Sequence, residues 1–201
     1  MKERPILFND EMVRAILDGR KTQTRRPVKP QPGHEYYLSL GPTGRGWVWS
    51  DGQAGNPCEP HCCHEMESPF GVAGDRLWVR ECWAIGTSWA ECDYRATNER
   101  GYAGKWTPSI HMPRSASRLN LLVKRVWVER VRDISEEDAK AEGVYVHNTD
   151  HVYGWTTDDD NTIHTYAKWA FGSLWDGIYA KQGYGWDDNP WVWCCEFEVV
   201  A

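Results

Sequence analysis

The apolar positions of this chain fall into short helical and strand-like patterns separated by long polar stretches. Apolar residues recur at helical spacing over residues 10–18, where Asn9 is placed to cap the first turn and Gly19 to end the last. The same reasoning predicts a second helix from Ser135 to Gly143 and a third over about 164–181.

Three segments show the composition or alternation of strands. Residues 76–83 place Leu77 and Val79 on one face, and two longer segments rich in Val and Trp follow at 119–131 and 191–200. The regular alternation of strands and helices of a doubly wound fold is missing. The pattern therefore predicts an α+β fold with a mixed or antiparallel sheet.

Long stretches with little periodicity interrupt these elements, at about 31–70, 84–113 and 145–162. A chain of 201 residues has the size of one domain. We therefore expect a single domain over residues 1–201 that carries these three stretches as loop insertions.

Composition limits the partners that this chain can have. A formal net charge of -6 excludes a general DNA-coating protein, so any contact with a nucleic acid must use a local basic patch on an acidic body. The chain has 13 Trp and 9 Tyr against 4 Phe. Rings with a polar edge serve small β-rich cores, which is their commoner use, and they also stack on nucleobases.

The cysteines and the first residues bear on location. The seven Cys form an odd number, and residues 1–5 lead into a strand-like Ile6–Phe8 instead of an apolar targeting segment. No apolar run approaches the length that a bilayer requires. We predict a soluble, cytoplasmic protein without a membrane partner, whose Cys are thiols or metal ligands.

A basic cluster follows the first helix, in residues 19–28. Burying unpaired cations is expensive, so four cations and two hydroxyls in one stretch suit a phosphate or a polar heterocycle. A solvated basic loop is the alternative. The cluster consists of Arg20, Lys21, Thr22, Thr24, Arg25 and Arg26.

This cluster and its helix, together with Gly74–Glu81, Ile134–Gly143 and the terminal strand, resemble an ASCH domain of the PUA-like superfamily. The opening Arg4–Asn9 and the segment Pro108–Arg114 are similar to the long ASCH proteins of lambdoid phages and prophages. The resemblance implies a PUA-like β-barrel with two to three flanking helices. It also implies a cleft for RNA or a modified nucleoside, and no cofactor.

Some small bacterial members of this family remove the acetyl group from N4-acetylcytidine, and others are reported as ribonucleases. The resemblance carries the amidohydrolase residues over to Lys21 and Thr24 by the Gly-Arg-Lys-Thr-x-Thr motif, and to Glu142 by a gapless reading of the second helix. In such chemistry a Thr hydroxyl attacks the amide and a Lys of depressed pKa takes its proton. A regular strand would point Lys21 and Thr24 to opposite faces, so the chain must turn between them.

We therefore predict an ASCH-type protein that binds RNA or a modified nucleoside in a basic cleft, with hydrolysis of an N4-acylated cytidine as an extension. The alternatives are a non-catalytic RNA-binding module of phage origin and a ribonuclease. The ribonuclease would use Lys21 or a His as its acid–base group. The expected substrate-binding residues are Arg20, Thr22, Arg25 and Arg26 from the motif, with His111 and Arg114 from the phage-type resemblance.

Two further patterns each allow two interpretations. Basic residues over 114–132 either extend the cleft for a phosphate backbone, with Trp127 stacking on a base, or form a polar sheet face. A Cys/His cluster either holds a structural Zn or is an incidental loop cluster. Its members are Cys58, His61, Cys62, Cys63 and His64.

Overall fold

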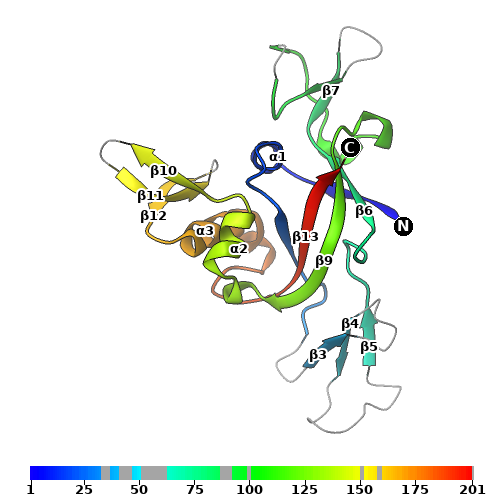
Figure 1. The fold of residues 1–201 in the computed structure, drawn as a ribbon, viewed down its shortest axis with the longest axis vertical. Helices are drawn as coiled ribbons and strands as arrows, with labels where there is room; N and C mark the ends of the chain where they lie inside the picture. The colour runs from blue at the N-terminus through cyan, green and yellow to red at the C-terminus, as the bar shows by residue number, and fades with distance from the viewer. Residues whose placement is uncertain are drawn as a thin grey trace.

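The computed structural model describes most of the chain and shows an α+β protein, which confirms the predicted class (Figure 1). One five-stranded sheet forms the centre, and smaller sheets of three, three and two strands accompany it. The described residues are 1–32, 37–40, 47–50, 63–86, 92–98, 101–149, 152–157 and 160–200.

The strands of the central sheet pair in the order β1-β6-β9-β13-β2. The first pair is parallel and the other three are antiparallel, so the predicted mixed sheet is confirmed. The long strands β9 and β13 curve side by side through the middle of the molecule (Figure 1). The five strands are β1 (Glu3–Leu7), β2 (Gln23–Pro27), β6 (Arg76–Arg80), β9 (Asn120–Arg130) and β13 (Trp191–Val200).

The edge strands β1 and β2 do not pair with each other in the described part of the chain, so a closed barrel is not confirmed. A side chain joins them instead. Nη2 of Arg26, on β2, donates to the backbone oxygen of Leu7, at the end of β1, over 2.8 Å. Nη1 of Arg26 donates to the hydroxyl of Tyr179 over 3.0 Å. We use the name seam for the line along which Leu7 and Arg26 meet.

The three predicted helices are present as α1 (Asp10–Leu17), α2 (Glu136–Ala141) and α3 (Ala167–Tyr179). The Asn9 side chain caps α1 as expected, accepting from the backbone N of Met12 over 2.9 Å. The third helix begins at Ala167, later than predicted, because Asp160–His164 forms strand β12.

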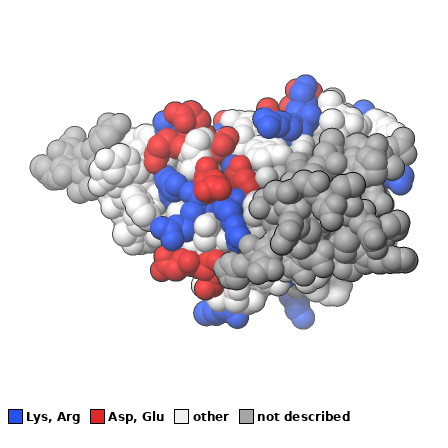
Figure 2. Space-filling model, turned by 90° about the horizontal axis from the view of Figure 1, so that it is seen from below, with Lys and Arg blue, Asp and Glu red and all other residues white. Residues whose placement is uncertain are grey.

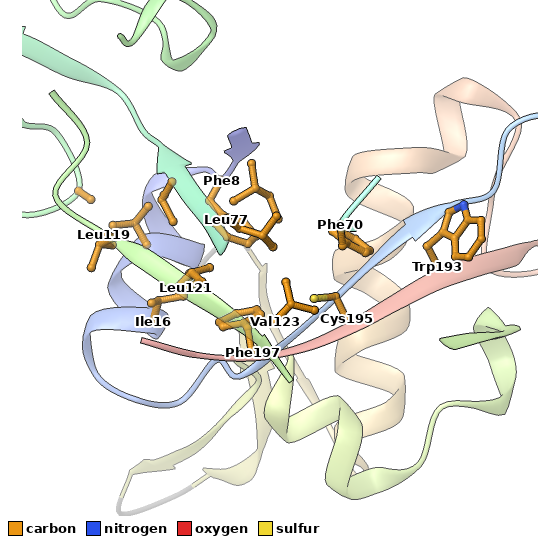
Figure 3. Close-up of a cluster of buried hydrophobic side chains, with 14 of the residues drawn as sticks. Phe8, Ile16, Phe70, Leu77, Leu119, Leu121, Val123, Trp193, Cys195 and Phe197 are labelled. Atoms are coloured by element: carbon orange, nitrogen blue, oxygen red, sulfur yellow. The ribbon is translucent and has the colours of Figure 1, made fainter. Parts of the chain in front are cut away.

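Two hydrophobic clusters lie on the two faces of the central sheet. Consecutive residues of β13 belong to different clusters: Cys195 packs with Phe8 and α1, and Cys194 packs with Trp175 and the other helices. Figure 3 shows the first cluster, in which Phe8 and Phe197 lie close to the strands. The helices thus cover both faces, and β2 lies between the two cores.

Strands occur within all three segments that the sequence pattern left as irregular insertions. Short strands broken by turn residues and Gly do not show a readable period of two, which is why the pattern missed them. In Figure 1 these small sheets extend away from the central sheet. They are β3 (Tyr37–Leu40), β4 (Trp47–Ser50), β5 (Cys63–Met66), β7 (Trp83–Ile85), β8 (Cys92–Tyr94), β10 (Tyr145–Thr149), β11 (Val152–Thr157) and β12.

The predicted Zn cluster is only partly covered by the structure. Cys58, His61 and Cys62 lie outside the described residues, and Cys63 and His64 are described only through the backbone of β5. Within the described ranges, no group of three or more His, Cys, Asp or Glu side chains is arranged to hold a metal ion. No helix among those described has the length and hydropathy needed to cross a membrane.

Candidate functional site

The structure brings Lys21 into contact with Glu142, which ends α2. Between α1 and β2 the backbone N of Lys21 donates to Ala15 and that of Thr22 to Ala141, over 2.9 and 2.8 Å. These bonds hold the segment against the end of α2. The Lys21 ammonium then donates to Oε2 of Glu142 over 2.5 Å and to its backbone oxygen over 2.9 Å.

A second buried cation holds the same carboxylate. Nη1 of Arg25 donates to Oε1 of Glu142 over 3.1 Å, and its Nε donates to Oε1 of Glu129, on β9, over 2.9 Å. The indole N of Trp127 donates to the other oxygen of Glu129 over 2.7 Å. The side chains of Lys21 and Arg25 are 0 % exposed. Both cations are therefore enclosed in one ionic network that joins β2, β9 and α2.

The two cations differ in how firmly they keep their charge. Burial lowers the pKa of Lys21, and the nearby Arg26 and Arg25 add to this effect, although the Glu142 carboxylate opposes it. Burial also works against the charge of Arg25, but Glu142 and Glu129 outweigh it and the net effect raises the pKa of Arg25. Arg25 thus stays a cation, whereas Lys21 can lose its proton more readily than an exposed Lys.

Thr24 has a buried hydroxyl without a hydrogen-bond partner in the part of the chain that the structure describes. The residue is 1 % exposed and pairs with Cys195 of β13. Lys21 precedes β2, so the strict alternation of a strand does not separate it from Thr24. The Lys21 ammonium lies 5.8 Å from the centre of the Phe8 ring, and the guanidinium of Arg26 lies 5.6 Å from the centre of the same ring.

A pocket of about 520 Å³ lies at the seam. Lys21, Thr24 and Glu142 are not among the residues that line it, whereas Phe8 both lines it and lies near the Lys21 ammonium. Arg95 pairs with Asp10 in its wall, over 2.5 Å. We call it the seam pocket, and its lining includes Leu7, Phe8, Asp10, Met12, Arg26, Cys82, Arg95, Trp106, Ile110, Ile178 and Tyr179.

The remaining predicted residues lie elsewhere. Arg20 donates to the backbone oxygen of Gly143 over 2.9 Å and pairs with Asp18, while Thr22 is exposed. Arg114 pairs with Glu3 over 3.1 Å.

His111 is exposed, and neither His111 nor Arg114 lines the seam pocket, although Ile110 of the same segment does. On the face shown in Figure 2, acidic and basic groups lie interspersed. Of the predicted binding residues, Arg26 is the one that belongs to the described lining of the seam pocket.

The basic residues of β9 have partners within the protein. Lys124 pairs with Glu198 over 3.2 Å, and Arg130 lies 4.4 Å from the ring centre of Trp191. Arg125 lies 4.8 Å from the ring centre of Trp127. These contacts support the interpretation of a polar sheet face over that of a phosphate path.

Sequence reasoning did not single out Phe8, Arg95, Trp106 and Tyr179 for this pocket. Phe8 and Tyr179 fit the apolar pattern of their elements, so nothing marked them as ligand contacts. Trp106 did carry a signal, because a large ring in a polar, irregular segment has little core to join.

No protein family model matches this chain, and no curated protein matches it. Among solved structures, the chain is similar to the protein EF3133 from Enterococcus faecalis V583, which is assigned to the family-model DUF984. The two chains are 12% identical, and the alignment covers 100% of this chain and 81% of that one, with a TM-score of 0.42.

Proposed function

We propose that this protein is an ASCH-type protein with a PUA-like fold that binds an N4-acylated cytidine, free or in RNA, and hydrolyses its amide. The observation that carries this proposal is the buried contact between Lys21 and Glu142. These residues lie 121 positions apart, and the family resemblance had assigned both to amide hydrolysis. The Arg26–Leu7 contact across the seam is compatible with a barrel that is closed there by side chains.

The seam pocket suits a pyrimidine nucleoside. Its volume of about 520 Å³ falls within the range of small-molecule sites, about 300–1,000 Å³. Phe8, Trp106 and Tyr179 offer ring surface to a planar base, while Arg26 and the Asp10–Arg95 pair offer donors and an acceptor to its polar edge.

In this proposal Thr24 and the buried ionic network supply the groups for the reaction. The Thr24 hydroxyl attacks the acyl carbon while the neutral amine of Lys21 accepts its proton. The ammonium then returns a proton to N4 of cytosine as the carbon–nitrogen bond breaks, which leaves an ester on Thr24. Water hydrolyses this ester and releases the carboxylic acid. Glu142 orients the Lys21 amine, and Arg25 holds Glu142 in place.

Phe8 controls access in this proposal. Lys21 and Thr24 are enclosed, and Phe8 belongs both to the pocket wall and to the surroundings of the Lys21 ammonium. An acyl group that enters from the pocket therefore has to displace the Phe8 ring. Closure behind the substrate would then exclude water from the first step.

The test is incubation of the purified protein with N4-acetylcytidine, with acetate and cytidine quantified. We expect release by the parent and by Thr24→Ser, and none by Thr24→Val or Lys21→Met. Circular dichroism of each variant shows that it is folded. A folded parent that releases no acetate, or a Thr24→Val protein that does, would reject the proposed hydrolysis.

A nucleoside-binding module without chemistry is the second candidate. The enclosure of Lys21 and Thr24 favours it, because a purely structural ion pair needs no access. Binding of cytidine in the seam pocket without any acetate release would establish this role. No histidine is among the described residues that line the seam pocket, so no observation there favours a ribonuclease with a His as its acid–base group.

A further inference from the structure

A second pocket lies beside the seam pocket and has a volume of about 440 Å³. Both pockets have Leu7, Arg26 and Tyr179 in their walls, so the Arg26 guanidinium stands between them. The proposed hydrolysis uses only the seam pocket and leaves this second pocket without a role. Its further lining includes Pro5, Ile6, Pro27, Lys29, Met66, Glu67, Pro69, Phe70 and Trp193.

The cations of the second pocket have neutral partners. Arg26 donates to the backbone oxygens of Leu7 and Arg25 and to the Tyr179 hydroxyl. The Lys29 ammonium lies 3.5 Å from the side-chain oxygen of Gln182 and 5.0 Å from the ring centre of Tyr184. Within the described residues neither cation forms an ion pair with a carboxylate, and the one acidic residue of the described wall is Glu67. Both charges therefore remain available to an anion.

Aromatic residues of the core border the same pocket. Phe70 and Trp193, which are 2 % and 3 % exposed, contribute to its wall, and Tyr179 is common to both pockets. In Figure 3, Phe8 and Trp193 stand apart, with Phe70 between them in that view. Two aromatic-walled pockets with a guanidinium between them match the repeating base and phosphate chemistry of a single-stranded nucleic acid.

We propose that the seam binds two consecutive nucleotides of a single strand. The first base occupies the seam pocket, the second base occupies the second pocket, and the linking phosphate contacts Arg26 and Lys29. This inference rests on the proposed function, because it places the reacting base in the seam pocket. It makes a nucleotide within a chain, and not a free nucleoside, the preferred ligand.

The test is a tryptophan-fluorescence titration of the protein with four probes. The probes are cytidine, its 5′- and 3′-monophosphates, and cytidylyl cytidine, in which one phosphodiester joins two cytidines. We expect cytidylyl cytidine to bind about tenfold tighter than the better monophosphate, because stacking of the second base adds to the phosphate contact. Raising the salt concentration should weaken the monophosphates and the dinucleotide, and leave cytidine unchanged.

Lys29→Gln is the informative variant, because Lys29 is exposed and its loss disturbs no buried contact. It should weaken the dinucleotide about tenfold, the value expected for one charge-assisted hydrogen bond, and leave cytidine binding unchanged. Lys124→Gln removes the same charge from β9, away from both pockets, and should bind every probe as the parent does.

Three results would overturn the inference: no binding of any probe, equal binding of the dinucleotide and a monophosphate, or a Lys29→Gln protein that keeps the parent's preference. Acetate release from N4-acetylcytidine is measured separately. Hydrolysis without a dinucleotide preference rejects this inference alone, whereas a Lys29-dependent preference without hydrolysis rejects only the proposed chemistry.

Discussion

Replacing Thr24 with valine exchanges one buried hydroxyl for a methyl group of nearly the same size. Thr24 is 1 % exposed, and its Oγ1 has no hydrogen-bond partner among the described residues. A buried polar group without a partner costs about 1–3 kcal/mol. Both side chains are β-branched and suit a strand. The Thr24→Val protein should therefore gain about 1 kcal/mol in free energy of unfolding, at the low end of that cost.

Thr24→Ser makes the opposite change at the same position. It keeps the hydroxyl and removes the methyl group of a residue that is 1 % exposed and pairs with Cys195 of β13. Losing one buried methyl group costs about 0.8 kcal/mol in transfer free energy, and the space left behind adds to it. The proposed chemistry therefore predicts a stable, inactive Thr24→Val and a less stable, active Thr24→Ser.

Urea unfolding followed by tryptophan fluorescence measures the stability of both variants, and acetate release from N4-acetylcytidine measures their activity. A valine variant less stable than the parent would show that the hydroxyl is hydrogen-bonded in solution, which would refute the reasoning from burial. A valine variant that retains hydrolysis would show that Thr24 is not the nucleophile.

The Lys21–Glu142 contact should respond unequally to changes on its two sides. Glu142→Leu leaves the buried Lys21 ammonium without its carboxylate, while Arg25 keeps Glu129, and should cost about 3–5 kcal/mol in urea unfolding. Lys21→Met leaves the Glu142 carboxylate its second cation, Arg25, and should cost less. Burial lowers the pKa of Lys21 in the folded protein. At pH values between this lowered pKa and the ordinary Lys pKa of about 10.4, the unfolded chain therefore binds more protons than the folded chain. The free energy of unfolding of the parent should therefore rise with pH in that window relative to Lys21→Met. Gly143→Ala should lower the melting temperature more than Gly19→Ala. Both have positive φ, but a Cβ at Gly143 would meet a side-chain carbon at 3.1 Å and one at Gly19 would meet nothing within 4 Å.

Each of these expectations has a contrary result. Equal losses for Glu142→Leu and Lys21→Met would mean that Arg25 does not hold the carboxylate. A stability difference between the parent and Lys21→Met that falls as pH rises would show that the Lys21 ammonium is favoured by folding. Equal melting temperatures for the two glycine variants would mean that the backbone at Gly143 moves to admit a side chain.

Local patterns predicted the elements whose causes are local. The helix α1 was predicted almost to the residue, because its cap at Asn9, its apolar spacing and Gly19 all lie within one short segment. β9 and β13 followed from their richness in Val and Trp, which favour strands. β2 was not predicted, since its sequence is polar and basic and its place in the sheet depends on pairing with distant β13. The parallel pairing of β1 with β6 has the same non-local origin.

The candidate site likewise has features that the sequence predicted and features that only the fold creates. The motif marked Lys21 and Thr24, but no spacing in the sequence links Lys21 to Glu142, and only the family resemblance placed them together. The seam pocket collects side chains from the end of β1, α1, the segment around Trp106 and the end of α3. No local sequence pattern predicts that these distant segments line one pocket. The buried, unpartnered Thr24 hydroxyl is likewise a property of packing.

The position of β13 in the sheet has a consequence for how the protein is made in the cell. Among the described strands, β2 forms its ladder with β13 alone, through pairs such as Thr24 with Cys195. During translation, Thr24 and Arg25 therefore lack this strand partner until β13, far downstream in the sequence, has been synthesised. Sheets built from contacts so distant in sequence fold slowly and expose unpaired strands in the meantime. We expect the ribosome-bound chain to lack this site and to depend on chaperones until β13 has left the exit tunnel.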